Sequence, residues 1–209
     1  MSLTDFKQTI AQFWDLEETE QTELLTKIRR YANTQRSKDF AKEVKQHFDQ
    51  VLFSGIEVIY EALSDEPKKW GGFFVKEYRR AFQAAEKAPN PFEILECLDE
   101  IGFADLEATA YNDQIIELIQ PYLDHDNLAI LYKALWNLGD FLTPSILDQY
   151  TGLEDRIKQQ LSHKNWKIRF AASTTLEDLD RLPSDYKVSF WDQWKIRFLD
   201  PYHISYNLI

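Results

Sequence analysis

Apolar side chains recur every three or four residues along most of this chain, which is the spacing of one face of an α-helix. The pattern begins in the segment from Phe6 to Phe13, and Asp15 is then placed to cap a second helix. A third apolar face extends from Ser37 to about Leu63, with a bend expected at Gly55, and a fourth extends from Trp70 to Lys87. The first part of the chain is therefore predicted to be helical.

Polar residues of the kind that begin helices mark the second part of the chain. Asn90 and Glu93, with a proline between them, form a capping box with proline at the first helical position. Thr143 precedes a proline in the same way, and Thr151 with Glu154 forms another capping box. Further starts are expected at Asn112 or Asp113, at Asp126, and at Lys164 or Asn165. No convincing strand pattern intervenes, so the predicted fold class is all-α.

The second part of the chain also repeats. The segment Leu123–Gly139 aligns with Leu161–Glu177 at an offset of 38 residues, with histidine, asparagine, alanine and leucine at matched places. A fainter copy, which begins at Asn90, lies 37 residues before the first. A pair of helices that recurs at about 40 residues is typical of HEAT and armadillo repeats.

The segment Asn165–Ala172, NWKIRFAA, followed by Leu176 and Leu179, resembles the second helix of a HEAT repeat. The resemblance covers about residues 90–180. It implies an α–α superhelix, a HEAT-like solenoid in which stacked helical hairpins share a continuous core. We therefore expect one all-α domain over residues 1–209, divided into N-terminal helices (1–65), HEAT-like helix pairs (66–180) and an aromatic C-terminal cap (181–209).

The composition fits a folded helical protein. Six glycines and seven prolines in 209 residues are few for a β-sandwich or barrel, and 44% hydrophobic residues argue against disorder. The single cysteine, Cys97, excludes an intramolecular disulfide and is expected to be a small core residue. No long apolar run predicts a membrane span and no signal-peptide pattern opens the chain, so we expect a cytoplasmic protein.

The net charge of −11 is concentrated in one segment. Residues 88–132 contain no Lys or Arg and ten acidic residues, whereas the other 164 residues hold 24 basic and 25 acidic groups. Negative charges this close together repel one another, so the stability of the fold gives no reason to concentrate them in one segment. The segment is interpreted either as a solvated face with some helix-start acids or as a surface for a basic partner.

The resemblance implies that the second helix of each pair lines the inner, concave surface. On the predicted 91–102 helix, Glu96, Asp99 and Glu100 point away from the core face, and the repeat places Trp136 and Asn137 at equivalent positions in the next pair. An aromatic residue beside acids is typical of an interface hot spot, although Trp136 can equally belong to the core. The predicted partner-binding residues are Glu96, Asp99, Glu100, Asp105, Glu107, Trp136 and Asn137.

The sequence contains no recognisable catalytic motif. Gly71 and Gly72 lack the lysine and spacing of a phosphate-binding loop, and no Gly-x-Ser-x-Gly elbow occurs. His125 and His163 occupy equivalent repeat positions, which indicates turn and capping chemistry rather than a metal site. We therefore expect no catalytic residue, no metal and no cofactor.

The last residues of the chain are rich in aromatic side chains. Their spacing fits a helix, but part of it also fits the alternation of a strand. Two roles are considered, a cap that closes the end of the repeat array and a docking surface for a partner. The rings concerned are Phe190, Trp191, Trp194, Phe198, Tyr202 and Tyr206.

These observations favour a non-enzymatic module whose acidic surface holds a basic partner protein. One concrete form is an immunity protein that neutralises a nuclease toxin, because a nuclease binds nucleic acid through a basic surface. Neither nucleic acid nor a membrane is expected as a partner. The alternatives are a HEAT-like DNA glycosylase or another HEAT-like enzyme, such as a bilin lyase, and a general assembly scaffold; the sequence leaves the oligomeric state open.

Overall fold

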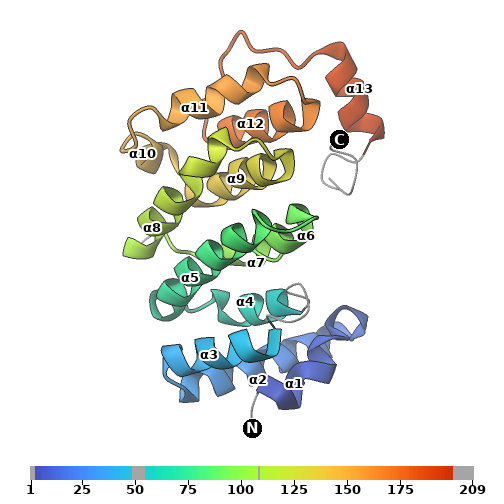
Figure 1. Ribbon diagram of the computed structural model, residues 1–209, viewed down its shortest axis with the longest axis vertical. Coiled ribbons are helices and arrows are strands. Elements are labelled where there is room, and N and C mark those ends of the chain that lie inside the picture. Colours follow the sequence, from blue (N-terminus) through green and yellow to red (C-terminus); the bar gives the residue numbers. More distant parts are fainter. Residues whose placement is uncertain (1–2, 49–54, 108, 200–209) are drawn as a thin grey trace. The chain divides into compact units, whose positions relative to one another are not determined.

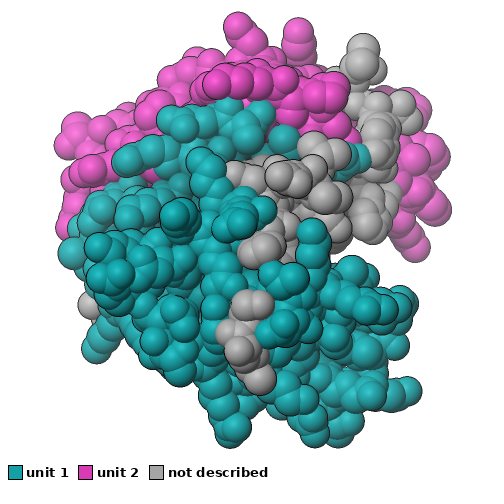
Figure 2. Space-filling view, turned by 60° about the horizontal axis from the view of Figure 1, so that its bottom comes forward, with its two compact units in different colours: residues 1–84, 93–114 teal, residues 85–92, 115–209 magenta. Residues whose placement is uncertain are grey.

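The computed structural model describes residues 3–48, 55–107 and 109–199 (Figure 1). Every regular element in these ranges is a helix, and they contain no strand, which confirms the all-α prediction. No helix among them is long and apolar enough to cross a membrane. The chain forms two compact units, which are coloured separately in Figure 2.

Unit 1 comprises residues 1–84 and 93–114, and unit 2 comprises residues 85–92 and 115–209. Helices α5, α6 and α8 contribute residues to both units. The elements up to α7 are α1 (Leu3–Ile10), η1 (Phe13–Asp15), α2 (Glu18–Thr34), α3 (Ser37–Phe48), α4 (Ile56–Ser64), α5 (Pro67–Ala85), α6 (Pro91–Glu96) and α7 (Asp99–Gly102). The later elements are α8 (Ala110–Ile119), η2 (Gln120–Asp124), α9 (Leu128–Phe141), α10 (Pro144–Leu147), α11 (Leu153–Gln159), η3 (Gln160–Ser162), α12 (Trp166–Asp178) and α13 (Phe190–Phe198).

Aromatic rings form the centre of unit 1. Phe40 of α3 lies 5.3 Å from Trp70 of α5, and Tyr60 of α4 lies 6.1 Å from Phe73 of α5, between ring centroids. All four side chains are buried. These contacts join three helices, because tilted and edge-on ring pairs add to the stabilisation that burial provides.

The predicted helix from Ser37 to Leu63 is two helices. Gly55 has φ of +81°, a left-handed conformation that glycine adopts without strain, and it is the N-cap of α4. The expected bend at Gly55 is therefore a helix boundary. Residues 49–54, which the prediction also included, lie outside the described residues.

The ring of Tyr111, at the start of α8, packs directly on the backbone of α5. A Cβ atom at Gly71 would overlap the ring, with Tyr111 Cγ 2.6 Å away, and one at Gly72 would lie 3.3 Å from Tyr111 Cε1. The two glycines thus allow close packing between helices within unit 1.

The repeat identified in the sequence corresponds to two equivalent turns in unit 2. Asn127 is the N-cap of α9 and accepts a hydrogen bond from the Ala129 amide, and Asn165 caps α12 by accepting one from the Lys167 amide. His125 Nδ1 accepts from the Asn127 amide at 2.9 Å, and His163 Nδ1 from the Asn165 amide at 3.0 Å. This confirms the turn chemistry predicted for the two histidines. Helices α9 and α12 pack against each other.

Several predicted helix starts are correct and others are displaced. Thr143 caps α10 as expected, accepting a hydrogen bond from the Ile146 amide at 3.3 Å. The capping box at Thr151 is wrong, because Gly152, with φ of +79°, is the N-cap of α11. The start predicted at Asp126 is one residue early, and the cap of α2 is Glu17 rather than Asp15. The helix predicted to start at Asn112 or Asp113 begins at Ala110.

The aromatic segment near the C-terminus is a helix, α13, up to Phe198. Its buried side chain is Asp192, which accepts hydrogen bonds from Arg169 of α12 at 2.6–2.8 Å. Two of the rings that were considered as a cap or as a docking surface are exposed, at 72% for Phe190 and 68% for Trp191. Tyr202 and Tyr206 lie outside the described residues.

Candidate functional site

Carboxylates from three helices gather in unit 1. Glu57 and Glu61 lie one turn apart on α4, which packs against α7. Helix α7 contributes Asp99 and Glu100, and Glu96 is the last residue of α6. We call these five residues the acidic cluster.

The pKa values of the cluster show that its members act on one another. Burial and, in decreasing order of importance, the negative charges of Glu61, Asp99 and Glu57 together raise the pKa of Glu100 to about 7. Burial also raises the pKa of Glu57, to which Glu96 adds a smaller repulsion. Since the charges of Glu61, Asp99 and Glu57 disfavour the ionised form of Glu100, the cluster stores unfavourable electrostatic energy in the folded chain.

Four of the five members of the acidic cluster have no cationic partner within the described residues. Glu57, Glu61, Glu96 and Glu100 form no ion pair with Lys or Arg in that part of the chain. Acids elsewhere do pair, as in Asp124 with Arg156 at 2.5 Å, Asp148 with Arg181 at 2.8 Å and Asp65 with Arg29 at 2.5 Å. The cluster is therefore a site where a cation from outside would be attracted.

Two exposed aromatic rings accompany these acids in unit 1. Trp14 is 65% exposed and donates a hydrogen bond to the Glu57 carboxylate. Phe103, which follows α7 directly, is 79% exposed. Exposed aromatic rings near uncompensated charge are the composition of a protein-binding surface, because rings supply contact area and charges supply specificity.

The structure brings together three of the seven predicted binding residues, Glu96, Asp99 and Glu100. Asp105 and Glu107 are exposed in the loop that follows α7, and they are not among the charges that act on Glu100. Trp136 and Asn137 belong to unit 2, so they are not part of the acidic cluster of unit 1.

Trp136 and Asn137 are more buried than the sequence indicated. Asn137 is 0% exposed, so its assignment to a binding surface is corrected: it is an interior residue of α9. Trp136 is half-buried and stacks on Tyr132, with ring centroids 5.9 Å apart and an interplanar angle of 11°. The reason is that α9 is apolar around most of its circumference and is covered on several sides.

The sequence did not identify Glu57 and Glu61 as members of the site. Their spacing of four residues places both on one side of a helix, and that signal was present in the sequence. What the spacing does not reveal is that α4 packs against α7, about 40 residues further along the chain.

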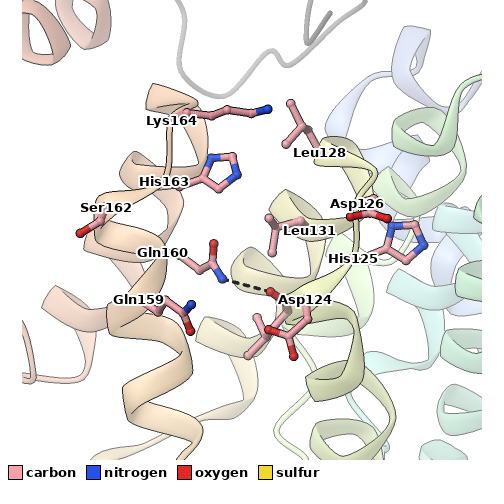
Figure 3. Close-up of a pocket in the computed structure, with 11 residues that line it drawn as sticks. Asp124, His125, Asp126, Leu128, Leu131, Gln159, Gln160, Ser162, His163 and Lys164 are labelled. Atoms are coloured by element: carbon pink, nitrogen blue, oxygen red, sulfur yellow. Dashed lines mark hydrogen bonds between the residues drawn. The ribbon is translucent and has the colours of Figure 1, made fainter.

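Unit 2 contains a polar groove of about 740 Å³ between its two equivalent turns (Figure 3). His163 and Lys164 project from one turn, and His125 and Asp126 belong to the other. Gln160 crosses part of the groove and donates to the Leu123 carbonyl at 3.1 Å. The groove follows from the stacking of two repeats.

The histidines of this groove are engaged in holding the turns. Each uses Nδ1 as an acceptor, which leaves Nε2 to carry the proton in the neutral ring. Burial, followed by the positive charges of Lys164 and Arg169, lowers the pKa of His163 against the opposing effect of its bond from the Asn165 amide. No group of His, Cys, Asp and Glu among the described residues is arranged to hold a metal ion.

Buried ionisable groups of unit 1 have packing roles. Cys97 donates to the Ile94 carbonyl at 2.9 Å, and burial raises the pKa of its thiol well above the usual range, which keeps it protonated. Tyr60 donates to Glu77 at 2.7 Å, and burial raises the pKa of Glu77 to about 7 against the lowering effect of that bond. Both groups lie inside the core rather than on an open surface.

No known protein family, curated protein or solved structure matches this chain. The chemistry of its own surfaces is therefore the basis for assigning a function.

Proposed function

We propose that this protein is a non-enzymatic binding module, and that the acidic cluster of unit 1 binds a basic region of a partner protein. The observation that carries the proposal is the raised pKa of Glu100, which reports burial and repulsion from Glu61, Asp99 and Glu57. A lysine or arginine brought to this position by a partner would relieve that repulsion, so the energy stored on folding would be recovered on binding.

The charge of the whole chain supports the same type of partner. A net charge of −11 attracts cationic proteins over a distance of about 8–10 Å at physiological salt and speeds their encounter. Trp14 and Phe103, exposed in the same unit, would then supply apolar contact area. Charge would bring the partner in, and the rings would slow its release.

The proposed architecture is a HEAT-like solenoid of stacked hairpins. Two features of unit 2 support it: the η2–α9 and η3–α12 segments begin with the same His and Asn turn, and α9 packs against α12. Solenoids of this kind commonly serve as extended surfaces for other proteins, which agrees with a binding role.

A basic nuclease toxin is the first partner class that we would test, which would make this chain an immunity protein. Nuclease domains concentrate Lys and Arg where they bind nucleic acid, and an acidic inhibitor can cover that surface. The charge and size of the chain support this hypothesis, which is more specific than the proposal that the chain is a binding module.

The test begins with the full chain as bait in an extract of its native cells, followed by purification of the captured partner. The affinity of that partner is then compared for the wild type, for the triple variant E57Q/E61Q/E100Q and for a control, E18Q/E177Q/D178N, which removes three exposed acids outside the cluster and outside the predicted binding residues. We expect the triple variant to lose about 10-fold or more in affinity and the control to lose less than about 3-fold.

The dependence on salt gives a second readout. The association rate of the wild type should fall as salt rises, and the triple variant should respond less steeply. Equal affinities for the triple variant and the wild type, or a captured partner that carries no basic surface, would overturn the proposal.

A further inference from the structure

A second groove, of about 370 Å³, lies entirely within unit 1. It is lined by positively charged side chains, in contrast to the acidic cluster of the same unit. Three helices line it: the start of α3, the middle of α5 and the start of α8. Its charged and polar lining residues are Lys69, Lys76, Arg79, Ser37, Tyr111 and Gln114.

The three cations of the groove occupy one face of α5. Lys69, Lys76 and Arg79 are separated by seven and then three residues, a spacing that returns to the same side of a helix. Lys69 donates to the neutral side chain of Asn33. Lys76 and Arg79 are exposed and form no ion pair within residues 3–48, 55–107 and 109–199.

This arrangement is unusual for a chain with a net charge of −11. Most arginines elsewhere in the described residues are paired with acids, such as Arg36 with Asp39 at 2.6 Å and Arg29 with Asp65 at 2.5 Å. None of the residues that line the groove is an Asp or a Glu. The positive field of the groove is therefore not cancelled by its own walls.

Neutral donors and the end of a helix complete the groove. Ser37 is the first residue of the 12-residue helix α3, so its hydroxyl and the first turn of that helix border the groove. Tyr111 adds a phenolic hydroxyl, and its ring is held in place because it packs on the backbone of Gly71 and Gly72. One wall is thus fixed before any ligand arrives.

We propose that this groove binds a phosphate-bearing ligand that carries two or more negative charges. Lys and Arg on α5, the Ser37 hydroxyl at the start of α3 and the Tyr111 hydroxyl on α8 match a tetrahedral anion that accepts hydrogen bonds from several directions. A single carboxylate would use fewer of these donors. The groove has room for a diphosphate or for a phosphorylated side chain.

This inference is independent of the proposed partner binding. The groove shares no residue with the acidic cluster, so variants can remove one without changing the other. The net charge of the chain opposes anion binding at long range, and for this reason binding has to come from the local geometry of the groove.

Isothermal titration calorimetry on the full chain tests the proposal with four probes. Pyrophosphate and ADP represent free phosphate ligands, and a phosphoserine peptide with its unphosphorylated form represents a modified protein. We expect at least one phosphate probe to bind with a Kd below about 1 mM at low salt, and the unphosphorylated peptide not to bind. Tighter binding of pyrophosphate or ADP assigns a free ligand, and tighter binding of the phosphopeptide assigns a modified partner.

The double variant K76Q/R79Q identifies the groove as the site. It should lower the affinity for the probe by about 10-fold or more. The control K68Q/K7Q, which removes two exposed lysines outside the groove, should change that affinity by less than about 2-fold. Circular dichroism of both variants checks that they fold. The absence of binding to every phosphate probe at about 5 mM, or an equal loss in the two double variants, would overturn the proposal.

Discussion

The ring of Tyr111 lies against the backbone of Gly71, with its Cγ 2.6 Å from the position that a Cβ atom would occupy. No side chain fits at that position unless one of the two helices moves. Gly72, the next residue, is less constrained, because its Cβ atom would be 3.3 Å from the Tyr111 ring.

Replacing these glycines by alanine should therefore give different results. Alanine favours a helix by about 1 kcal/mol over glycine, but forcing an atom into a packed contact costs about 1–3 kcal/mol. We expect G71A to lower the free energy of unfolding by about 1–2 kcal/mol and G72A to change it by less than about 1 kcal/mol. Urea unfolding of the two variants measures the difference, and equal stabilities would show that Tyr111 does not pack as described.

The repeated turns of unit 2 give a prediction about helix capping. Asn127 and Asn165 both accept hydrogen bonds from the first turn of the helix that follows, so N127A and N165A should each cost about 1 kcal/mol of stability. T151A should cost less than about 0.5 kcal/mol, because Gly152 rather than Thr151 begins α11. Thermal unfolding compares the three variants. A loss of stability in T151A as large as that in N165A would show that Thr151 does cap α11, as the sequence predicted.

The sequence predicted those features that depend on neighbours along the chain. The all-helical fold and the cap at Thr143 follow from patterns a few residues long, and the turns at His125 and His163 are local structures that the repeat made recognisable. Local hydrogen bonds determine such features, so the residues involved lie close together in the sequence as well.

Features that depend on packing between helices were predicted less well. Asn137 was assigned to a surface because the repeat places it at a position equivalent to an acid of the 91–102 helix, whereas it is completely buried in the folded chain. Glu57 was not considered, because its proximity to Glu100 arises only when α4 packs against α7. The acidic segment was correctly identified as unusual, but its seven acids of unit 1 and three of unit 2 do not belong to one compact unit.

The attachment of α13 gives a third prediction. Asp192 is 5% exposed and receives two hydrogen bonds from Nη2 and one from Nε of Arg169, at 2.6–2.8 Å. Removing one partner of a buried pair leaves the other charge uncompensated, which costs about 3–5 kcal/mol when the rest of the structure cannot adjust. We expect D192A to release α13, because the exposed rings of this helix contribute little to holding it.

Hydrogen exchange of the backbone amides measures that release. Residues 190–198 should exchange about 10-fold faster or more in D192A, and the amides of α9 should be unchanged. D185A, which removes an exposed acid of the preceding connection, is the matched control and should leave α13 protected. Unchanged protection of α13 in D192A would show that its aromatic side chains, and not the ion pair, hold it in place.

The raised pKa of Glu100 predicts how stability depends on pH. In the unfolded chain this carboxyl has its ordinary pKa of 4.5, and in the folded protein burial and its acidic neighbours raise the pKa to about 7. At pH values between these two pKa values, the Glu100 carboxyl therefore ionises more readily in the unfolded chain than in the folded one. The stability of the wild type, compared with that of E100Q, should fall as the pH rises from about 4.5 to about 7 and stay constant above.

E100Q should accordingly be more stable than the wild type at pH 8, and the two should converge near pH 5. The carboxyl is partly exposed and water screens it, so we expect a gain of about 1 kcal/mol rather than the larger value for full burial. Urea unfolding at pH 5, 6.5 and 8 measures it. In an E61Q background the gain from E100Q should shrink, because Glu61 is the strongest of the charges that act on Glu100. A gain that is the same at all three pH values, or that does not change in the E61Q background, would mean that the acidic cluster stores no repulsion for a partner to relieve.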